Sequence, residues 1–224
     1  MKAGDRSRLS TRPSALIFDW DNTLVDTWGV IHDALNTTLV AFGKTPWTMD
    51  ETRTRVRKSM RDSFPDLFGD EWEDAGEVFY RRYAEIHMLK LEAKNGAARM
   101  LESLHGQGFV MAVVSNKTGD YLRAEARHLG WDRFFSRIVG ANDAVRDKPA
   151  PDPILMALEG TDIETGAGVW FVGDADIDLH CAHSAGCYPV LLRDQPPSEG
   201  EFPDHPPARH FSDCMALCKF VDNM

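Results

Sequence analysis

Residues 16–24 read Leu16-Ile17-Phe18-Asp19-Trp20-Asp21-Asn22-Thr23-Leu24, and the fold is predicted outward from this stretch. An apolar run typical of a buried strand, Ala15–Phe18, ends directly in two acids, Asp19 and Asp21. Unpaired charge is costly to bury, so acids at the end of a buried strand indicate that a cation meets them. The alternative is a strand that leaves the core into a solvated Asp-Asn turn. This segment alone leaves both interpretations open.

Three further apolar runs also end in polar groups suited to chemistry. They are Phe109–Val114 before Ser115, Ile138–Gly140 before the loop with Lys148, and Val169–Val172 before Asp174 and Asp178. Each run is short, carries β-branched residues and is separated from the next by helix-like sequence, which predicts a parallel sheet with crossovers. Ligands bind beyond the carboxyl ends of the strands in such sheets. We therefore expect the polar groups at one sheet edge, which favours a catalytic site over a solvated turn.

These motifs carry a resemblance to a known family. In order and type, Asp19-x-Asp21-x-Thr23, Ser115, Lys148 and Gly173-Asp174-x-x-x-Asp178 resemble the four motifs of the haloacid dehalogenase-like (HAD) superfamily. Within it, Val114-Ser115-Asn116-Lys117 and Lys148-Pro149-x-Pro151-x-Pro153 look most like the phosphoglycolate phosphatase-like branch. The resemblance spans residues 16 to about 190. One departure is Trp20-Asp21-Asn22, where that family more often has Leu-Asp-Gly, but the acidic pair is intact.

The fold that the resemblance implies is an α/β fold with a Rossmann-like parallel sheet core (the HAD fold). A small all-helical cap of the C1 type is inserted after the first strand. We expect a flexible leader (1–14), a core domain (15–27 and 93–224) and a helical cap domain (28–92). Such an insert closes over an open sheet edge and excludes water from the site. The alternative is a helical layer packed permanently on the sheet.

Several helices and one more strand are expected from periodicity and turn residues. A helix from Trp28 to Phe42 follows the first motif, and Thr48 with Glu51 forms a capping box for the next. A long amphipathic helix is expected over Glu71–Leu91, with Leu89 on its buried face. Near the end of the chain we expect a fifth strand at Tyr188–Leu192, an irregular segment at 194–207 and a helix over Phe211–Val221.

The two acids of the first motif have distinct chemistry. Asp19 is the candidate nucleophile, because a carboxylate attacks phosphorus and carries the phosphoryl group as an aspartyl-phosphate. Asp21 protonates the leaving oxygen and then deprotonates the attacking water. Dehalogenating members of the superfamily lack this second acid, since a halide needs no proton. The presence of Asp21 therefore favours a phosphate ester as substrate.

A phosphoryl ester and two carboxylates come together only with a cation, which implies Mg²⁺ with oxygen ligands. By resemblance, Asp19 and Asp174 bind it with their side chains, Asp21 with its backbone carbonyl and Asp178 through a water. Asp176 matches no family position and is expected to be solvated.

The remaining site residues are expected to handle phosphate charge. Ser115 donates a hydrogen bond to a phosphate oxygen, and Lys148 neutralises the phosphoryl group and Asp19. The resemblance also implies substrate-binding roles for Thr23 and Asn116. Taken alone, a serine after a strand commonly caps a turn, and a lysine before proline is commonly solvated. The other motifs favour the catalytic roles.

Selectivity is predicted to rest on Arg61, in the stretch 58–64 at the middle of the cap. This stretch resembles the loop that reaches over the substrate in related capped phosphatases and mutases. An arginine there binds an anionic part of the substrate in bidentate fashion. The alternative is a solvated arginine on a basic helix face.

Composition limits the partners. A formal net charge of −10 over 224 residues argues against a nucleic-acid partner, and no apolar run is long enough to span a bilayer. The first 14 residues are basic but lack the apolar segment of a secretory signal, so a disordered leader is expected, with an organellar presequence as the alternative. We therefore expect a cytoplasmic protein. Its four cysteines are expected to stay reduced, because a soluble enzyme without a secretory signal keeps its thiols so. The alternative is a zinc site with the nearby histidines, although their spacing matches no standard site.

The function favoured by these motifs is a Mg²⁺-dependent phosphatase that hydrolyses a small phosphorylated metabolite through an aspartyl-phosphate. The first alternative is a phosphotransferase or phosphomutase of the β-phosphoglucomutase type, in which a sugar hydroxyl replaces water. The second is a non-catalytic binding protein that retains the fold. The motifs leave the identity of the substrate and the oligomeric state open.

Overall fold

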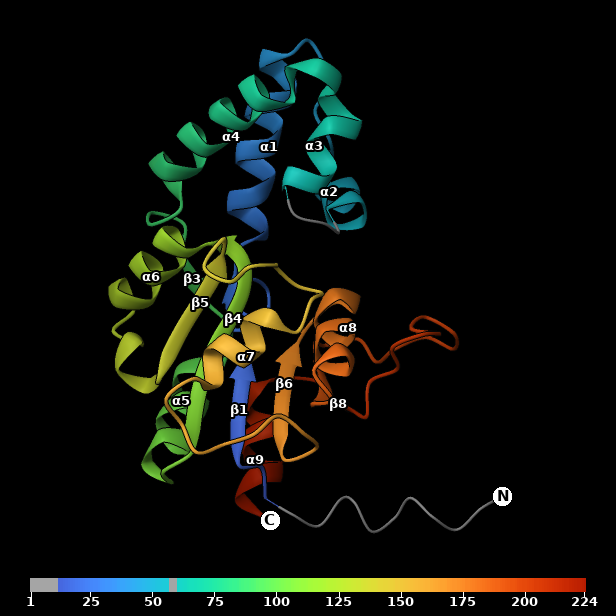
Figure 1. Ribbon diagram of the computed structural model, residues 1–224. Coiled ribbons are helices and arrows are strands. Elements are labelled where there is room, and N and C mark those ends of the chain that lie inside the picture. The colour runs from blue at the N-terminus through green and yellow to red at the C-terminus, as the bar shows by residue number, and fades with distance from the viewer. Residues whose placement is uncertain (1–11, 57–59) are drawn as a thin grey trace. The chain divides into compact units, whose positions relative to one another are not determined.

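The computed structural model describes residues 12–56 and 60–224, with the side chains of 60–62 left out (Figure 1). The described residues divide into two compact units. The first, here the core unit, contains the chain up to Leu24 together with Lys94–Met224. The second, here the insert unit, is Val25–Ala93. Within the described residues, none of the helices has the length and apolar sequence that crossing a bilayer needs.

The core unit is built on one sheet. Its strands are β1 (Ala15–Phe18), β4 (Val110–Thr118), β5 (Arg137–Ala141), β6 (Val169–Gly173), β7 (Tyr188–Leu192) and β8 (Arg209–Phe211). The strand order is β5-β4-β1-β6-β7-β8, and every neighbouring pair is parallel. The predicted α/β fold with a parallel sheet is therefore confirmed, and the first strand of the sequence lies in its middle.

The position of β1 determines where the acidic pair lies. Its last residue, Phe18, lies opposite Val113 of β4 and Val172 of β6. All four residues of β1 are buried, as expected for a strand flanked on both sides and covered on both faces. The chain therefore leaves the core at the carboxyl edge between β4 and β6, with Asp19 as the first residue outside.

Helices cover both faces of this sheet (Figure 1). They are α5 (Ala97–Gly106), α6 (Gly119–His128), the short η2 (Asp132–Phe134), α7 (Asp152–Leu158), α8 (Asp176–Ser184) and α9 (Cys214–Asp222). Helices α7 and α8 bury Ile154 and Cys181 against Ile17 and Phe171 of the strands. On the opposite face Trp170 of β6 packs against Phe220 of α9, with ring centroids 6.2 Å apart. Because side chains alternate between the two faces of a sheet along a strand, neighbouring residues of β6 pack against helices on opposite faces.

The insert unit is mainly helical. It contains α1 (Trp28–Ala41), α2 (Met49–Arg55), α3 (Met60–Phe68), η1 (Gly69–Glu71) and α4 (Trp72–Ile86). Its apolar cluster includes Leu35 and Leu39 of α1, Phe64 and Phe68 of α3, and Ala75 of α4. The unit therefore has an apolar core of its own.

Two expectations for the insert hold at the level of single residues. Helix α1 follows the first motif as predicted. The capping box before α2 forms, because Glu51 N donates to Thr48 Oγ1 at 3.2 Å and Thr48 N donates to Glu51 Oε2 at 2.9 Å.

The prediction of one long helix over 71–91 is wrong at its C-terminal end. Helix α4 begins at Trp72, one residue after the predicted start, but it ends at Ile86, so Leu89 lies beyond the helix and is 84% exposed. Leu89 follows the helical spacing of the apolar residues before it, and for this reason the predicted helix was extended too far. The chain instead turns so that β3 (Glu92–Ala93) pairs antiparallel with β2 (Val25–Asp26). The insert is therefore not entirely helical.

The end of the chain also differs from the prediction. Arg209–Phe211 forms β8, parallel to β7, where a helix was expected to begin at Phe211. Helix α9 begins only at Cys214, after Asp213, whose carboxylate accepts a hydrogen bond from Ala216 N at 2.8 Å. A three-residue strand is too short for a period of two to appear in the sequence, which is why β8 was missed.

Candidate active site

The turn after β1 presents the first motif at the sheet edge. Asp19 N donates to Val172 O at 2.8 Å, and Leu24 N donates back to Trp20 O at 2.9 Å. Asn22 within this turn has φ 63°, a left-handed conformation that asparagine tolerates better than most residues. This conformation explains how asparagine replaces the glycine more common at this point of the family motif.

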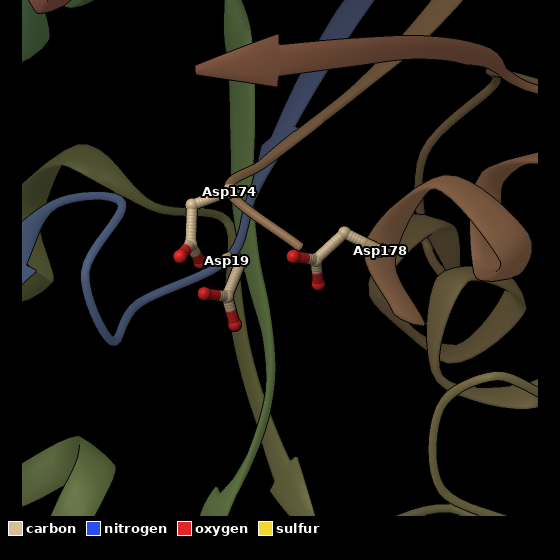
Figure 2. Close-up of side chains that lie close together, drawn as sticks. All are labelled: Asp19, Asp174 and Asp178. Carbon is tan, nitrogen blue, oxygen red and sulfur yellow. The ribbon is translucent and has the colours of Figure 1, made fainter. Parts of the chain in front are cut away.

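Three acids converge at this edge, as Figure 2 shows. Asp19 follows β1, Asp174 follows β6, and Asp178 lies in the first turn of α8; each offers a carboxylate oxygen, and these oxygens lie within 4.8 Å of one another. Gly173 permits the approach of Asp178, because a Cβ at Gly173 would overlap the Asp178 side chain. The three acids lie up to 159 residues apart in the sequence, and the parallel sheet brings them together.

Lys148 lies among these acids. Its Nζ is 2.7 Å from Asp19 Oδ1 and 2.7 Å from Asp178 Oδ1, and its side chain is 3% exposed. Burial by itself lowers the pKa of this amine, but the attraction of Asp178 and Asp19 outweighs burial and raises the pKa. Lys148 is therefore a fixed positive charge beside Asp19.

The electrostatics of the cluster favour a further cation. Burial, together with repulsion from Asp178 and Asp21, raises the pKa of Asp19 to about 7 against the attraction of Lys148. Burial and repulsion from Asp178 and Asp19 likewise raise the pKa of Asp174 well above its ordinary value. These shifts mean that the three acids are crowded beyond what one ammonium group offsets.

The donor set fits a hard divalent cation. Carboxylate oxygens are the ligands that Mg²⁺ prefers, and three of them converge here, with Lys148 as the ammonium group that contacts two of them among the described residues. Asp19, Asp174 and Asp178 are the residues whose side chains would hold such an ion.

Thr23 orders two of these acids. Its Oγ1 lies 3.2 Å from Asp19 Oδ2 and 3.4 Å from Asp174 Oδ1, and the residue is fully buried. The contact with Asp19 is the closer of the two. Thr23 therefore contacts the carboxylates of Asp19 and Asp174, and a substrate-binding role for it stays a prediction.

The second motif lies on an irregular part of β4. The pairing of β4 with β5 shifts register between Val114 and Thr118, and such irregularities re-aim side chains. Ser115 is buried here, and its Oγ accepts a hydrogen bond from Lys117 N at 3.2 Å. Ser115 therefore lies at the same carboxyl edge of the sheet as Asp19.

Asn116 holds the loop that carries Lys148. Its Nδ2 donates to Lys148 O, and its Oδ1 accepts from Lys148 N, both at 3.0 Å. This two-point contact links β4 to a residue 32 positions later in the sequence. The Asn116 side chain therefore fixes the backbone of Lys148. A role of Asn116 in substrate binding stays a prediction.

Two charged residues without a predicted role lie close to Asp21: Lys117 pairs with it, and Glu125 pairs with Lys117. Lys117 Nζ lies 2.6 Å from Asp21 Oδ1 and 2.6 Å from Glu125 Oε2. In the sequence, Lys117 stands out only as part of the second motif, and Glu125 does not stand out. The available signal for Glu125 was a charged residue on the buried side of the helical pattern that forms α6.

Three further predictions concern residues that are not ligands in this cluster. Asp176 has a 60% exposed side chain, in line with the prediction that it is solvated. All four cysteines are free, as expected, and all are buried: Cys181, Cys187, Cys214 and Cys218. The side chain of Arg61 lies outside the described residues, so its role stays a prediction.

Comparison with known proteins agrees with this geometry. Residues 16–191 match the family model of haloacid dehalogenase-like hydrolases. The chain is 30% identical over 177 residues to a phosphoglycolate phosphatase of Aquifex aeolicus, covering 79% of this chain and 83% of that one. It is 28% identical over 215 residues to a phosphoglycolate phosphatase of Rhodobacter capsulatus, covering 93% and 96%.

A solved structure has the same fold. It is described as a putative phosphoglycolate phosphatase from Lactobacillus delbrueckii subsp. bulgaricus, with a TM-score of 0.83 at 21% identity, and the match covers 94% of this chain and 99% of that one. At this identity the likeness concerns the fold alone. The family model, the relatives and the acidic cluster lead to one conclusion: this chain belongs to the haloacid dehalogenase-like hydrolases.

Proposed function

We propose that this protein is a Mg²⁺-dependent phosphatase that hydrolyses the phosphate monoester of a small metabolite through a phosphorylated Asp19. The observation that carries the proposal is the arrangement around Asp19: a buried carboxylate with Lys148 at 2.7 Å, two further acids beside it and a second motif acid, Asp21, two residues on. A carboxylate nucleophile needs its charge held and its leaving group protonated, and this arrangement supplies both.

In the first step, an Asp19 carboxylate oxygen attacks phosphorus, and the bond from phosphorus to the ester oxygen breaks. Asp21 in its protonated form donates a proton to the departing oxygen, so the product leaves as a neutral alcohol. Lys148 keeps its positive charge beside Asp19 and offsets the negative charge of the phosphoryl oxygens. Ser115 is proposed to donate a hydrogen bond to one of those oxygens. Mg²⁺, when bound, supplies Lewis-acid charge stabilisation of the phosphoryl group.

In the second step, Asp21, now ionised, takes a proton from a water molecule whose oxygen attacks phosphorus. The bond between Asp19 and phosphorus breaks, inorganic phosphate leaves, and Asp19 returns as a carboxylate. Asp21 ends the cycle protonated, ready for the next ester. A phosphomutase would use a sugar hydroxyl in place of this water, and no feature of the described residues favours that acceptor.

The proposed substrate class is a small phosphorylated carboxylic acid such as 2-phosphoglycolate. The names of the relatives from Aquifex aeolicus and Rhodobacter capsulatus support this class. A net charge of −10 repels anions in general, so binding such a substrate requires local positive charge. Lys148 supplies it at the phosphoryl end, and Arg61 is the proposed contact for the substrate's second anionic group.

The function is tested by assaying phosphate release from a panel of phosphorylated metabolites with Mg²⁺, with matched variants at the two motif acids. Asp19→Asn is expected to lose activity by at least about 10³-fold on every substrate, because it removes the nucleophile. Asp21→Asn is expected to lose about 10²- to 10⁴-fold on alkyl phosphates, because general acid–base catalysis contributes about that much.

The control is Asp176→Asn, which removes an exposed acid from the same segment and is expected to keep wild-type rates. Activity of Asp19→Asn within tenfold of wild type would contradict the covalent mechanism. Release of a phosphorylated sugar isomer in place of inorganic phosphate would identify a mutase.

A further inference from the structure

Four side chains next to the candidate nucleophile form one continuous chain of contacts. Trp20 Nε1 donates to Glu125 Oε2 at 2.7 Å, Lys117 Nζ lies 2.6 Å from the same oxygen, and Lys117 Nζ lies 2.6 Å from Asp21 Oδ1. Trp20 and Asp21 flank each other in the turn after β1, Lys117 lies on β4, and Glu125 lies on α6. The contacts therefore tie three separate elements to the second motif acid.

The burial of this chain is costly and needs a reason. Glu125 is 0% exposed, and the Lys117 side chain is 6% exposed. Each ion loses hydration on burial, and an ion pair repays that loss only when its geometry and hydrogen bonds are very good. An apolar pair of similar size would stabilise the fold as well or better. A buried pair of this kind next to a catalytic acid is therefore better explained by what it does for the acid than by stability.

Lys117 is held from the side opposite Asp21. Glu125 offsets its charge and accepts its hydrogen bond, while the Trp20 indole fixes the shared Glu125 oxygen. Trp20 is itself fully buried and packs edge to face on Trp131, with ring centroids 5.8 Å apart. The ammonium group therefore has a defined place relative to the backbone of the first motif.

The contact reaches one oxygen of Asp21. Oδ1 is buried and has no hydrogen-bond partner among the described residues, so its contact with Lys117 is an ion pair, whereas the side chain as a whole is 23% exposed through its other atoms. An ion pair through one oxygen restrains the orientation of a carboxyl group and leaves its other oxygen for proton transfer. General acid–base catalysis depends on such placement, since the proton must travel over a hydrogen-bond distance.

We propose that Lys117, anchored by Glu125 and Trp20, is a positioning residue that fixes the orientation of Asp21 for proton transfer. The proposal rests on the proposed acid–base role of Asp21. It assigns no contact with the substrate to Lys117, whose charge is taken up by two carboxylates. It also accounts for the tryptophan at position 20, since an aliphatic residue there has no donor for Glu125.

The first test compares Lys117→Met with wild type on two substrates that differ in their need for an acid. The quantity is kcat/KM, which reports the steps through release of the first product. For an alkyl phosphate, kcat/KM is expected to fall at least about tenfold, a fraction of the full contribution of general acid catalysis. For p-nitrophenyl phosphate, whose leaving group departs without a proton, it is expected to fall less than about threefold. Equal losses on both substrates would overturn the proposal.

The second test is a double-mutant cycle with Asp21→Asn, read as kcat on p-nitrophenyl phosphate, where breakdown of the aspartyl-phosphate still needs a base. Lys117→Met is expected to lower kcat in the wild-type background and to add less than about twofold in the Asp21→Asn background. Additive losses would mean that Lys117 acts independently of Asp21. Lys117→Arg is expected to restore at least part of the rate, because it keeps the charge.

Controls separate positioning from general damage. Lys219→Met removes an exposed lysine of α9 and is expected to keep wild-type rates. Lys117→Met leaves Glu125 buried without its cation, so the double variant Lys117→Met/Glu125→Gln is measured beside it; the glutamine oxygen still accepts from Trp20. If Lys117→Met fails to fold, both tests are made with the double variant, for which the same results are expected and the same results would overturn the proposal.

A structural readout keeps this proposal distinct from the proposed function. If wild type turns over neither substrate, the proposed function fails. The crystal structure of the Lys117→Met/Glu125→Gln variant then decides the positioning role. A changed or multiple orientation of the Asp21 side chain supports it, and an orientation identical to that of wild type overturns it.

Discussion

At the scale of single residues, the site relies on two buried lysines that each lie between two acids. Lys148 joins Asp19 to Asp178, at 2.7 Å on both sides. Lys117 joins Asp21 to Glu125, at 2.6 Å on both sides. The arrangement separates the roles of the motif acids, because the nucleophile candidate and the acid–base candidate each have their own fixed cation.

Cysteine reactivity gives a prediction at this scale. Burial raises the pKa of Cys181 to about 12, and its Sγ donates to Ala150 O at 3.1 Å. Burial also raises the pKa of Cys214 to about 11. At about pH 8 only a very small fraction of either thiol is ionised, and the thiolate is the reactive form. Both are expected to resist an aromatic disulfide reagent in the native protein, measured by absorbance and peptide mass mapping.

The raised pKa values of Cys181 and Cys214 also determine in which direction stability changes with pH. The folded state retains these thiol protons to a higher pH than the unfolded state, whose thiols titrate near their ordinary value. The free energy of unfolding is therefore expected to fall as the pH rises from about 9 toward 12.

The control for the labelling experiment is the protein in guanidinium chloride, in which all four cysteines should react rapidly with the disulfide reagent. Fast labelling of native Cys181 at about pH 8 would contradict its burial.

At the scale of elements, the site depends on how closely α8 begins after β6. Gly173 ends β6, α8 begins three residues later at Asp176, and Asp178 in its first turn occupies the space that a side chain at Gly173 would need. Asp178 Oδ2 accepts a hydrogen bond from Ala175 N at 3.1 Å, which fixes the turn between them. The short connection is therefore what brings a helix residue into the carboxylate cluster.

Gly173→Ala tests this connection. A Cβ at Gly173 would overlap the Asp178 side chain, so either α8 or the carboxylate must shift. The expected cost in the free energy of unfolding is about 1–3 kcal/mol, typical of overpacking, measured by urea denaturation. The matched control is Gly106→Ala in α5, where an added Cβ meets nothing within 4 Å. There a gain of up to about 1 kcal/mol is expected. Equal effects of both substitutions would refute the proposed close approach.

At the scale of the whole molecule, the acids come from three parts of the core unit that are distant in sequence and meet only in the folded chain. Asp19, Asp174 and Asp178 are buried or partly buried, and within the part of the chain that the structure describes Lys148 is the one ammonium group that pairs with any of them. The folded state therefore holds a repulsion that the unfolded chain lacks. A ligand that relieves this repulsion stabilises the fold as a whole.

Mg²⁺ is accordingly expected to raise the Tm in a concentration-dependent manner, measured by calorimetry with and without a chelator. At a concentration about 100 times the Kd, the expected stabilisation is about 2.7 kcal/mol. Asp174→Asn should lose this response and should be at least as stable as wild type without metal, because one buried charge is gone. Asp176→Asn should keep the full response. An equal Mg²⁺ response in all three proteins would exclude this cluster as the binding site.

The sequence by itself determined the parallel sheet, the place of the acidic pair at its carboxyl edge and the four motifs that meet there. Apolar runs of strand length are local signals, and parallel strands necessarily gather their carboxyl ends at one edge. Short elements such as β8 escaped prediction, because three residues carry no readable period. The left-handed turn at Asn22 was equally out of reach, since many residue types occupy turns.

Only the tertiary structure decided which charges meet. Trp20 and Glu125 are 105 residues apart in sequence, and their contact depends on which face of α6 lies against the turn after β1. The partner of Asn116 was also decided by the tertiary structure: its side chain makes two hydrogen bonds to the backbone of Lys148. An amphipathic pattern marks the buried side of a helix, but the partner of a buried charge is set by the packing of separate elements, which no local pattern records.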